Sequence, residues 1–136
     1  MSPPAQTSAA PTKGFPVSRT TPTRVLRLEA LAIATASLMA YSATGSGWGL
    51  YFGLWLIPDL AIALYLASPK VGSVAYNLTH NLVFPVLLCS AGLWLEPESL
   101  YLPIGLIWLS HVAIDRALGF GLKYPTFFKD THLART

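Results

Sequence analysis

A small set of polar and charged side chains lies inside long apolar stretches of this 136-residue chain, and these are the residues whose types could do chemistry. They are Asp59, Asn77, His80, Asn81, His111, Asp115 and Arg116. Even on a lenient scale, a charged side chain at the centre of a membrane helix costs about 2.5 to 3.5 kcal/mol. Such residues need partners, so together they predict a functional site.

Two carboxylates and two imidazoles in this set suit a divalent metal. The predicted ligands are Asp59, His80, His111 and Asp115. Carboxylate oxygens and imidazole nitrogens bind zinc or manganese, with a position left open for water. Because a metal ion makes such a water nucleophilic near neutral pH, the set favours hydrolysis. Asn77 or Asn81 would then orient the substrate or the ligands.

Two other interpretations of the same residues stay open. His80 and His111 come from different helices at similar depth, so they would also suit axial ligation of a haem or another macrocycle. Asp59 and Asp115 would then lie beside the ring with no evident use. Alternatively, the set is a polar network that fixes the register of the helices and binds nothing.

Further residues are predicted around the site. Arg116 follows Asp115 directly and must point to another side of its helix, toward Glu29 or the membrane interface. Lys123 is expected at the mouth of the site, where it would attract a phosphate. His132 lies in the tail and would fold back to supply a ligand or an acid.

The chain that must position these residues is apolar. Its residues are 53% hydrophobic and 11% charged, and the charged share is less than half of the roughly 25% typical of soluble domains. This composition excludes a large soluble enzyme and a nucleic-acid-binding protein. Cys89 is the single cysteine, which excludes an internal disulfide and a cysteine-based zinc site.

Four apolar segments of about 20 residues are predicted to be membrane helices, because that length crosses ~30 Å of hydrocarbon. The segments are 25–44, 48–67, 71–95 and 100–122. Short links force antiparallel neighbours, so the predicted fold class is an all-α membrane protein, a four-transmembrane-helix antiparallel bundle over 24–122. Residues 1–23, rich in Pro, Ser and Thr, are expected to form a disordered tail, and 123–136 a short cytoplasmic tail.

The basic residues predict the orientation of this bundle. Eight of the nine Lys and Arg residues flank the same ends of the predicted helices. Cytoplasmic segments retain Lys and Arg, so both termini are expected in the cytoplasm of a multi-pass inner (plasma) membrane protein. Four aromatic residues would then serve as anchors at the opposite boundary, namely Tyr41, Trp48, Trp94 and Tyr101.

The predicted ligands share one depth. With a rise of about 1.5 Å per residue from the cytoplasmic helix ends, Asp59 lies ~12 Å deep, His80 ~15 Å, His111 ~16 Å and Asp115 ~10 Å. Pro58 and Pro85 are expected to kink the second and third helices beside this level. A shared site in the cytoplasmic half of the bundle explains these coincidences together.

Short motifs along about four fifths of the chain resemble a known family. They are Leu26-Arg27-Leu28-Glu29, Pro58-Asp59-Leu60, Tyr76-Asn77-Leu78-Thr79-His80, Asp115-Arg116-Ala117-Leu118-Gly119, Gly121-Leu122-Lys123-Tyr124-Pro125 and Asp130-Thr131-His132-Leu133. The family is the uncharacterised bacterial integral-membrane "domain of unknown function 4260". This resemblance implies an integral membrane protein and brings no established activity.

A second resemblance concerns the order of the motifs. Pro58-Asp59, Thr79-His80, Ser110-His111-x3-Asp115 and Tyr124-Pro125 are similar in order to motifs of the bacterial membrane-bound metal-dependent hydrolases. This resemblance implies metal-dependent hydrolysis. The chain departs from that pattern at Ala75-Tyr76-Asn77, where those proteins carry His-Arg, and at Asn81, where they carry Ser.

These observations lead to one functional prediction and one alternative. The prediction is a metal-binding membrane protein that hydrolyses a lipid-like or membrane-proximal ester or phosphoester. The alternative is a non-catalytic accessory subunit of a larger membrane complex, associated with a haem or pigment. The expected partners are the lipid bilayer and either other subunits or further copies of the chain, and no nucleic acid.

Overall fold

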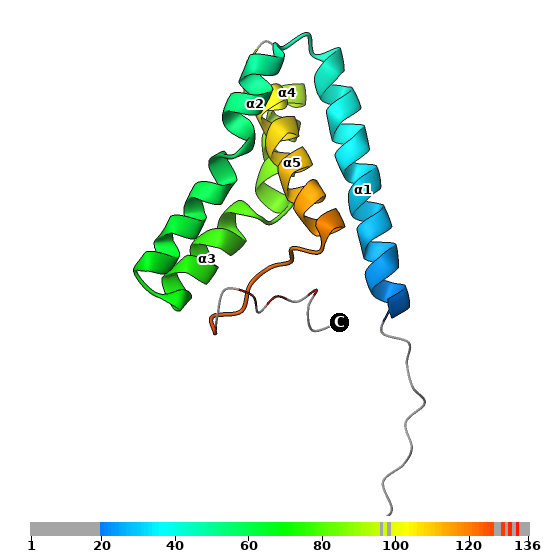
Figure 1. Ribbon diagram of the computed structural model, residues 1–136. Helices are drawn as coiled ribbons and strands as arrows, with labels where there is room; N and C mark the ends of the chain where they lie inside the picture. Colours follow the sequence, from blue (N-terminus) through cyan, green and yellow to red (C-terminus); the bar gives the residue numbers. More distant parts are fainter. Residues whose placement is uncertain are drawn as a thin grey trace, which may run out of the picture.

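The computed structural model describes residues 20–95, 97, 99–126, 129, 131 and 133, and within them the secondary structure is helical apart from one isolated β-bridge (Figure 1). The helical segments are α1 Thr20–Ala43, α2 Trp48–Trp55, the 3-10 helix η1 Ile57–Leu66, α3 Pro69–Thr79, α4 Val83–Trp94 and α5 Tyr101–Leu118. The predicted all-α class is therefore confirmed.

These segments correspond to the four predicted helices, because α2 with η1 and α3 with α4 each occupy one predicted segment. Among the described residues, three runs are long and apolar enough to cross a membrane, namely Pro22–Ala43, Trp48–Leu66 and Pro69–Trp94. The chain is thus a helical, multi-pass membrane protein with three candidate spans. α5, the fourth predicted span, is not among these three candidates, and it lies in contact with α1, α2 and α4 (Figure 1).

Both breaks within the long segments fall beside the polar residues. Pro58 has no backbone N–H, and α2 gives way to η1 immediately before it. α3 ends at Thr79, and the side-chain oxygen of Asn81 accepts a hydrogen bond of 2.9 Å from the N–H of Val83 at the start of α4. The breaks place the neighbouring polar residues at helix ends, where they can turn toward α5.

α5 ends at Leu118, one turn before the predicted end at residue 122. Gly119 has φ +103°, a left-handed conformation that suits glycine, and its N–H donates to the carbonyl of Arg116 at 3.1 Å. A Cβ at Gly119 would lie 2.5 Å from a guanidinium nitrogen of Arg27. The glycine therefore also admits the Arg27 cation to the negative end of the α5 dipole.

At the other end, α1 begins at Thr20, five residues earlier than predicted. Of the predicted disordered tail, residues 1–19 lie outside the described residues. The predicted C-terminal tail is described only at 123–126, 129, 131 and 133.

The core lies around α5. A Cβ at Gly105 would lie 2.7 Å from Sγ of Cys89, so this glycine lets α4 and α5 pack closely. Tyr41 and Tyr51 pack edge to face against each other in the core, at a centroid distance of 5.1 Å. Tyr41, expected to be an interfacial anchor, is instead fully buried, because its hydroxyl donates to the carbonyl of Gly47 at 2.8 Å.

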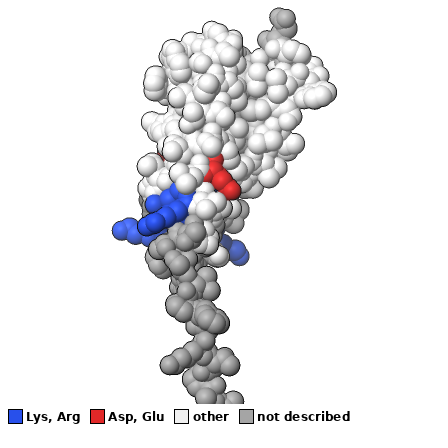
Figure 2. Space-filling model, turned by 90° about the vertical axis from the view of Figure 1, so that its right-hand side faces the viewer, with Lys and Arg blue, Asp and Glu red and all other residues white. Residues whose placement is uncertain are grey.

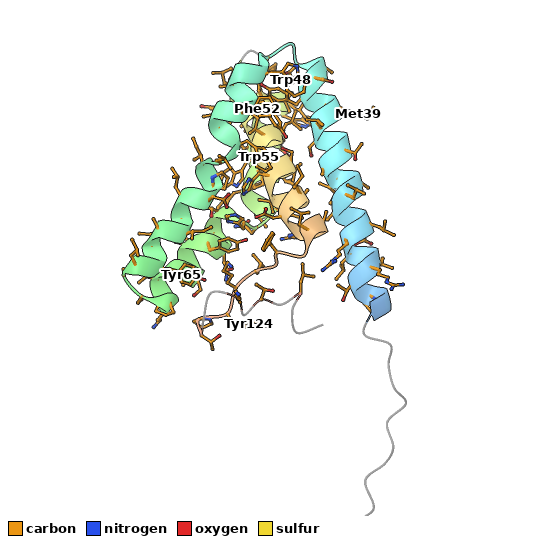
Figure 3. All side chains as sticks on the ribbon, in the orientation of Figure 1. Met39, Trp48, Phe52, Trp55, Tyr65 and Tyr124 are labelled. Carbon is orange, nitrogen blue, oxygen red and sulfur yellow. The ribbon has the colours of Figure 1, made fainter. Side chains whose placement is uncertain are left out.

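The outer surface is largely apolar. Large apolar side chains are exposed on each candidate span, for example Met39, Phe52 and Val74; Met39 is labelled on the outer side of α1 in Figure 3. Figure 2 shows that on one face the Lys and Arg side chains gather at one end of the molecule, while the other end carries none. This distribution is typical of a membrane protein, whose exterior meets hydrocarbon and whose basic residues meet water.

Candidate metal centre

Three elements bring the four predicted ligands together. Asp59 lies in the first turn of η1, and His80 follows the last residue of α3 as its C-cap. His111 and Asp115 lie one turn apart on α5, and so share a face of that helix. The four side chains therefore form one cluster, here called the Asp/His cluster.

The ligand atoms of the Asp/His cluster surround one point. Nε2 of His80 lies 3.2 Å from Nε2 of His111, 3.3 Å from Oδ1 of Asp59 and 3.4 Å from Oδ2 of Asp115. Nε2 of His111 lies 3.5 Å from the same oxygen of Asp59 and 3.7 Å from that of Asp115. All four ligand atoms lie within 4.8 Å of one another.

These separations fit a tetrahedral metal site. Zinc binds nitrogen and oxygen ligands at roughly 2.0 to 2.2 Å, and in a regular tetrahedron such ligands are about 3.3 to 3.6 Å apart. Five of the six separations, 3.2 to 3.7 Å, match that spacing, and the sixth, between the two carboxylate oxygens, is at most 4.8 Å. The two histidines and two aspartates therefore form a group that could hold one divalent ion.

The charges of the Asp/His cluster also fit a divalent cation. In the protonation states that metal binding requires, with neutral imidazoles and ionised carboxylates, the four side chains would carry a charge of about −2, which needs compensation inside a membrane protein. The basic groups near the cluster are few, and Arg116 faces another cavity. A divalent ion would bring the cluster to neutrality, which no hydrogen bond among these four side chains can do.

His80 is oriented by its own helix. Its Nδ1 lies 3.1 Å from the carbonyl oxygen of Tyr76 and 2.9 Å from the hydroxyl of Thr79. The carbonyl can only accept a hydrogen bond, which favours the tautomer with the proton on Nδ1. Nε2 then keeps its lone pair and points it into the cluster, the usual arrangement for a metal-binding histidine.

His111 is held by packing. Its side chain is 1% exposed, and its ring meets the ring of Trp55 edge-on at a centroid distance of 4.9 Å. Trp55 lies at mid-height of the molecule in Figure 3. Among the described residues Nδ1 of His111 has no hydrogen-bond partner, so its polar contacts all lie on the Nε2 side.

The Asp/His cluster is reachable from one side. The side chain of Asp59 is 37% exposed and that of Asp115 18%, whereas both histidines are almost completely buried. A small molecule can therefore approach the ligand atoms past Asp59. A tetrahedral zinc ion held by all four side chains would have no open position, so a catalytic ion at this site would need a fifth position for water.

Tyr76 and Asn77 connect the cluster to the chain that follows α5. Tyr76 stacks on His80, with ring centroids 3.7 Å apart and planes 9° from parallel, and its hydroxyl lies 3.5 Å from Oδ2 of Asp115. The side chain of Asn77 accepts from the N–H of Lys123 at 2.7 Å and donates to its carbonyl at 2.8 Å. This double hydrogen bond ties the segment after α5 to α3.

Lys123, predicted at the mouth of the site, is buried beside Tyr76, with 6% of the residue exposed. Its ammonium nitrogen lies 4.5 Å from the centroid of the Tyr76 ring, a cation–π arrangement. Burial lowers the pKa of Lys123, and the nearby Asp115 carboxylate partly offsets this. The positive charge of Lys123 therefore lies on the side of the cluster that faces the C-terminal segment.

The structure places the other predicted residues away from the ligand atoms. Arg116 and Glu29 line one cavity of about 130 Å³ between α1 and α5, although among the described residues they form no ion pair. The side-chain amide of Asn81 donates to the carbonyl oxygens of Asn77 and Leu78, at 3.0 and 2.6 Å, at the junction of α3 and α4. His132 lies outside the described residues.

The same geometry bears on the haem alternative. Axial ligation places two histidine nitrogens on opposite faces of a macrocycle, with the ring between them. Here the two Nε2 atoms are 3.2 Å apart, and both carboxylates approach the same point. This arrangement favours one small ion over a macrocycle.

Sequence reasoning missed the roles of Tyr76 and Thr79, which orient His80. Tyr76 precedes His80 by four residues, so both project from one helix face, and this spacing was the available signal. The hydroxyl of Thr79 lies 3.2 Å from the carbonyl of Pro58, which ties α3 to η1 beside Asp59.

The comparisons with known proteins place the chain in a family. A family model described as domain of unknown function (DUF4260) matches residues 23–136. The chain therefore belongs to this family, as its motifs predicted. No curated protein and no solved structure matches the chain.

Proposed function

We propose that this member of the DUF4260 family is a metal-dependent membrane hydrolase, with zinc or manganese held by Asp59, His80, His111 and Asp115. The observation that carries the proposal is the set of five distances of 3.2 to 3.7 Å among the nitrogen and oxygen atoms of the cluster. The partial exposure of Asp59 supports access of water to the site, and hydrolysis would need the ion to bind that water beside the four side chains.

The chemistry is hydrolysis of an ester or phosphoester. When bound, a divalent metal would supply Lewis-acid activation of the substrate and of a water molecule. The water oxygen forms a bond to the carbonyl carbon or phosphorus, the bond to the leaving oxygen breaks, and one water proton passes to the released alcohol. The acid product takes the remaining hydroxyl group.

The chain's own residues would hold and orient the participants. Tyr76 and the carbonyl of its helix keep His80 turned toward the cluster. Asp59 lies on the exposed side, where substrate and water enter. Lys123 places a positive charge beside Tyr76 and near Asp115, where it would attract a phosphate group of the substrate.

The orientation proposed for the membrane follows from charge. Arg24, Arg27 and Lys70 lie at the ends of α1 and α3 that meet the C-terminal segment, and Lys123 lies in that segment. Figures 1 and 2 support this grouping at one end of the molecule. Because Lys and Arg are retained on the cytoplasmic side, we place this end and both termini in the cytoplasm and the protein in the inner membrane.

Metal content tests the proposal directly. Elemental analysis of protein purified in mild detergent is expected to give close to one equivalent of zinc or manganese. His111→Ala is expected to lower the content at least about tenfold, because it removes a buried ligand. Glu29→Gln, which removes a carboxylate from the other cavity, is the matched control and should leave the content unchanged. Equal metal content in both variants, or none in the unaltered protein, would overturn the proposal.

A further inference from the structure

A second cavity, of about 300 Å³, lies beside the Asp/His cluster. Six of its lining residues come from the α2–η1 junction and from α5: Leu54, Ile57, Pro58, Ile104, Ile107 and Trp108. The seventh, Thr79, precedes the metal-site histidine His80. Its position next to the cluster makes this cavity the place to look for the substrate.

The walls of this cavity offer a ligand apolar groups, because most lining residues are apolar and the polar groups are hydrogen-bonded within the protein. Trp108 and Thr79 contribute the polar side-chain groups, and both are engaged within the protein. The indole N–H of Trp108 donates to the carbonyl of Thr79 at 2.6 Å. The hydroxyl of Thr79 lies within 3.2 Å of three backbone carbonyls. A ligand in the cavity therefore meets hydrocarbon, and an apolar group is what it would take.

The cavity lies at the depth of lipid chains. Leu54 to Pro58 fall at the middle of the candidate span Trp48–Leu66, and Ile57, which lines the cavity, is 50% exposed on the outer surface. The wall of the cavity thus reaches the surface that faces the bilayer. Lipid acyl chains are the apolar molecules present there in excess.

The apolar cavity, the Asp/His cluster and the Lys123 cation follow one another along the chain. The acyl chain, the ester linkage and the headgroup of a lipid follow one another in the same order. The cavity is lined by residues 104–108 of α5, the ligands are His111 and Asp115, and Lys123 follows the helix. With a rise of about 1.5 Å per residue, residues 104 to 115 extend over about 16 Å. In a lipid, likewise, the chain lies deepest, the ester linkage comes next and the headgroup lies nearest water.

We propose that the cavity binds an acyl chain of a bilayer lipid, so that the carboxyl ester at the end of this chain lies at the Asp/His cluster and the phosphate of the headgroup lies toward Lys123. The substrate class is then an acyl ester of a phospholipid. The substrate role rests on the proposed hydrolase function, whereas occupancy of the cavity does not require a metal.

The size of the cavity is adequate for this occupant. An apolar cavity of roughly 150 Å³ takes up a benzene molecule. The present cavity has about 300 Å³ and therefore accepts a longer apolar group, such as the upper part of an acyl chain. Each buried methylene contributes about 0.8 kcal/mol, so filling the cavity favours binding of the chain over a bare headgroup.

Photolabelling in liposomes tests the inference. The probe is phosphatidylglycerol with a diazirine near the carboxyl end of one acyl chain, and the labelled residues are mapped by mass spectrometry. We expect more labelling at residues 54–58 and 104–108 than on the exposed face of α1. Ile104→Trp should lower cavity labelling about tenfold, the effect of losing roughly two buried methylenes. The control is Leu87→Trp on the exposed side of α4, which should leave it unchanged.

The other outcomes are equally informative. If the cavity is labelled no more than α1, or if both tryptophan variants act alike, the probe reports boundary lipid only and the inference is overturned. If Ile104→Trp instead changes the oligomeric state, the cavity is a contact between copies. If Ile104→Trp does not fold, Ile57→Trp replaces it as the test variant, because the half-exposed Ile57 tolerates a larger side chain more easily.

Metal analysis on the same samples separates the two proposals. Bound metal without cavity labelling contradicts the acyl-chain inference alone. Cavity labelling without bound metal contradicts the hydrolase and the substrate role of the lipid. Both results together support the complete proposal, with lyso-lipid and fatty acid as the expected products.

Discussion

Two neighbouring residues of α5 differ in the partners of their polar side chains. Ser110 lies 2.9 Å from the hydroxyl of Tyr51 and donates to the carbonyl of Ile107 at 2.7 Å, so the polar atoms of this pair have partners within the protein. His111, the next residue, points its Nε2 at another histidine and two carboxylates. The hydroxyls of the Tyr51–Ser110 pair satisfy each other, whereas the Asp/His cluster brings two carboxylates together and suits a cation.

Whether buried polar groups satisfy one another indicates a ligand site more reliably than the mere presence of buried polar residues. A buried polar group is tolerated when a hydrogen bond satisfies it, and Tyr51 with Ser110 meets that condition. Like-charged groups that converge on one point need a shared proton or an opposite charge, and a divalent cation supplies that charge. Removing a residue from the cluster should therefore affect ion binding, and removing one from the pair should affect only stability.

The largest expected effect is on metal affinity. Asp115→Asn keeps the shape of the side chain and removes its charge, so we expect affinity for zinc to fall about 100-fold or more, the upper range for losing even an outer partner. Competition with a chromophoric chelator measures the affinity. Ser110→Ala, on the same helix, should leave it within about twofold. Comparable losses of zinc affinity in Asp115→Asn and Ser110→Ala would contradict the prediction that the cluster binds the ion and the Tyr51–Ser110 pair does not.

The next effect is on stability. An ion that binds only the folded chain stabilises it by about 2.7 kcal/mol at a concentration 100 times its dissociation constant. Zinc should therefore raise the unfolding temperature of the detergent-solubilised protein, followed by circular dichroism, and a chelator should reverse the rise. The variant His111→Ala should show no response to zinc. A response of the same size in this variant would place the ion elsewhere.

The sequence predicted the parts of the cluster because they depend on local rules. Helix length, short links and the depth of His80 and His111 follow from residue counts along each segment, and these led to the four ligands that the structure brings together. The helix breaks at Pro58 and after Thr79 could also be predicted from the sequence, because proline disrupts helical hydrogen bonding.

What the sequence did not reveal depends on contacts between distant segments. The double hydrogen bond of Asn77 joins it to Lys123, 46 residues later, after a sharp turn at Gly119. The burial of Tyr41 depends on the short loop that follows it and on its packing against Tyr51. Spacing along one helix does not specify such arrangements, because they are set by how helices pack and by which rotamers then fit.

A smaller effect is expected where the cluster meets the C-terminal segment. Asn77→Ala removes both hydrogen bonds to the backbone of Lys123, which contribute about 1 kcal/mol each. Hydrogen exchange of the amide of Lys123 should accelerate by about tenfold or more, while metal content stays the same. Asn81→Ala removes bonds at the α3–α4 junction instead, so it serves as the control and should not accelerate exchange at Lys123. Loss of metal in Asn77→Ala would mean that the segment forms part of the metal site.

The smallest expected effect is on the stability contributed by the Tyr51–Ser110 hydrogen bond. Tyr51→Phe removes the hydroxyl that meets Ser110, and we expect the free energy of unfolding to fall by about 1 kcal/mol, the usual net value of one hydrogen bond. A double-mutant cycle with Ser110→Ala isolates the interaction, since each variant alone removes the same bond. The coupling should be independent of zinc, because neither hydroxyl contacts the ligand atoms of the Asp/His cluster. A coupling that grows when zinc is added would show that pair and cluster act as one unit, and would make Ser110 a positioning residue for His111.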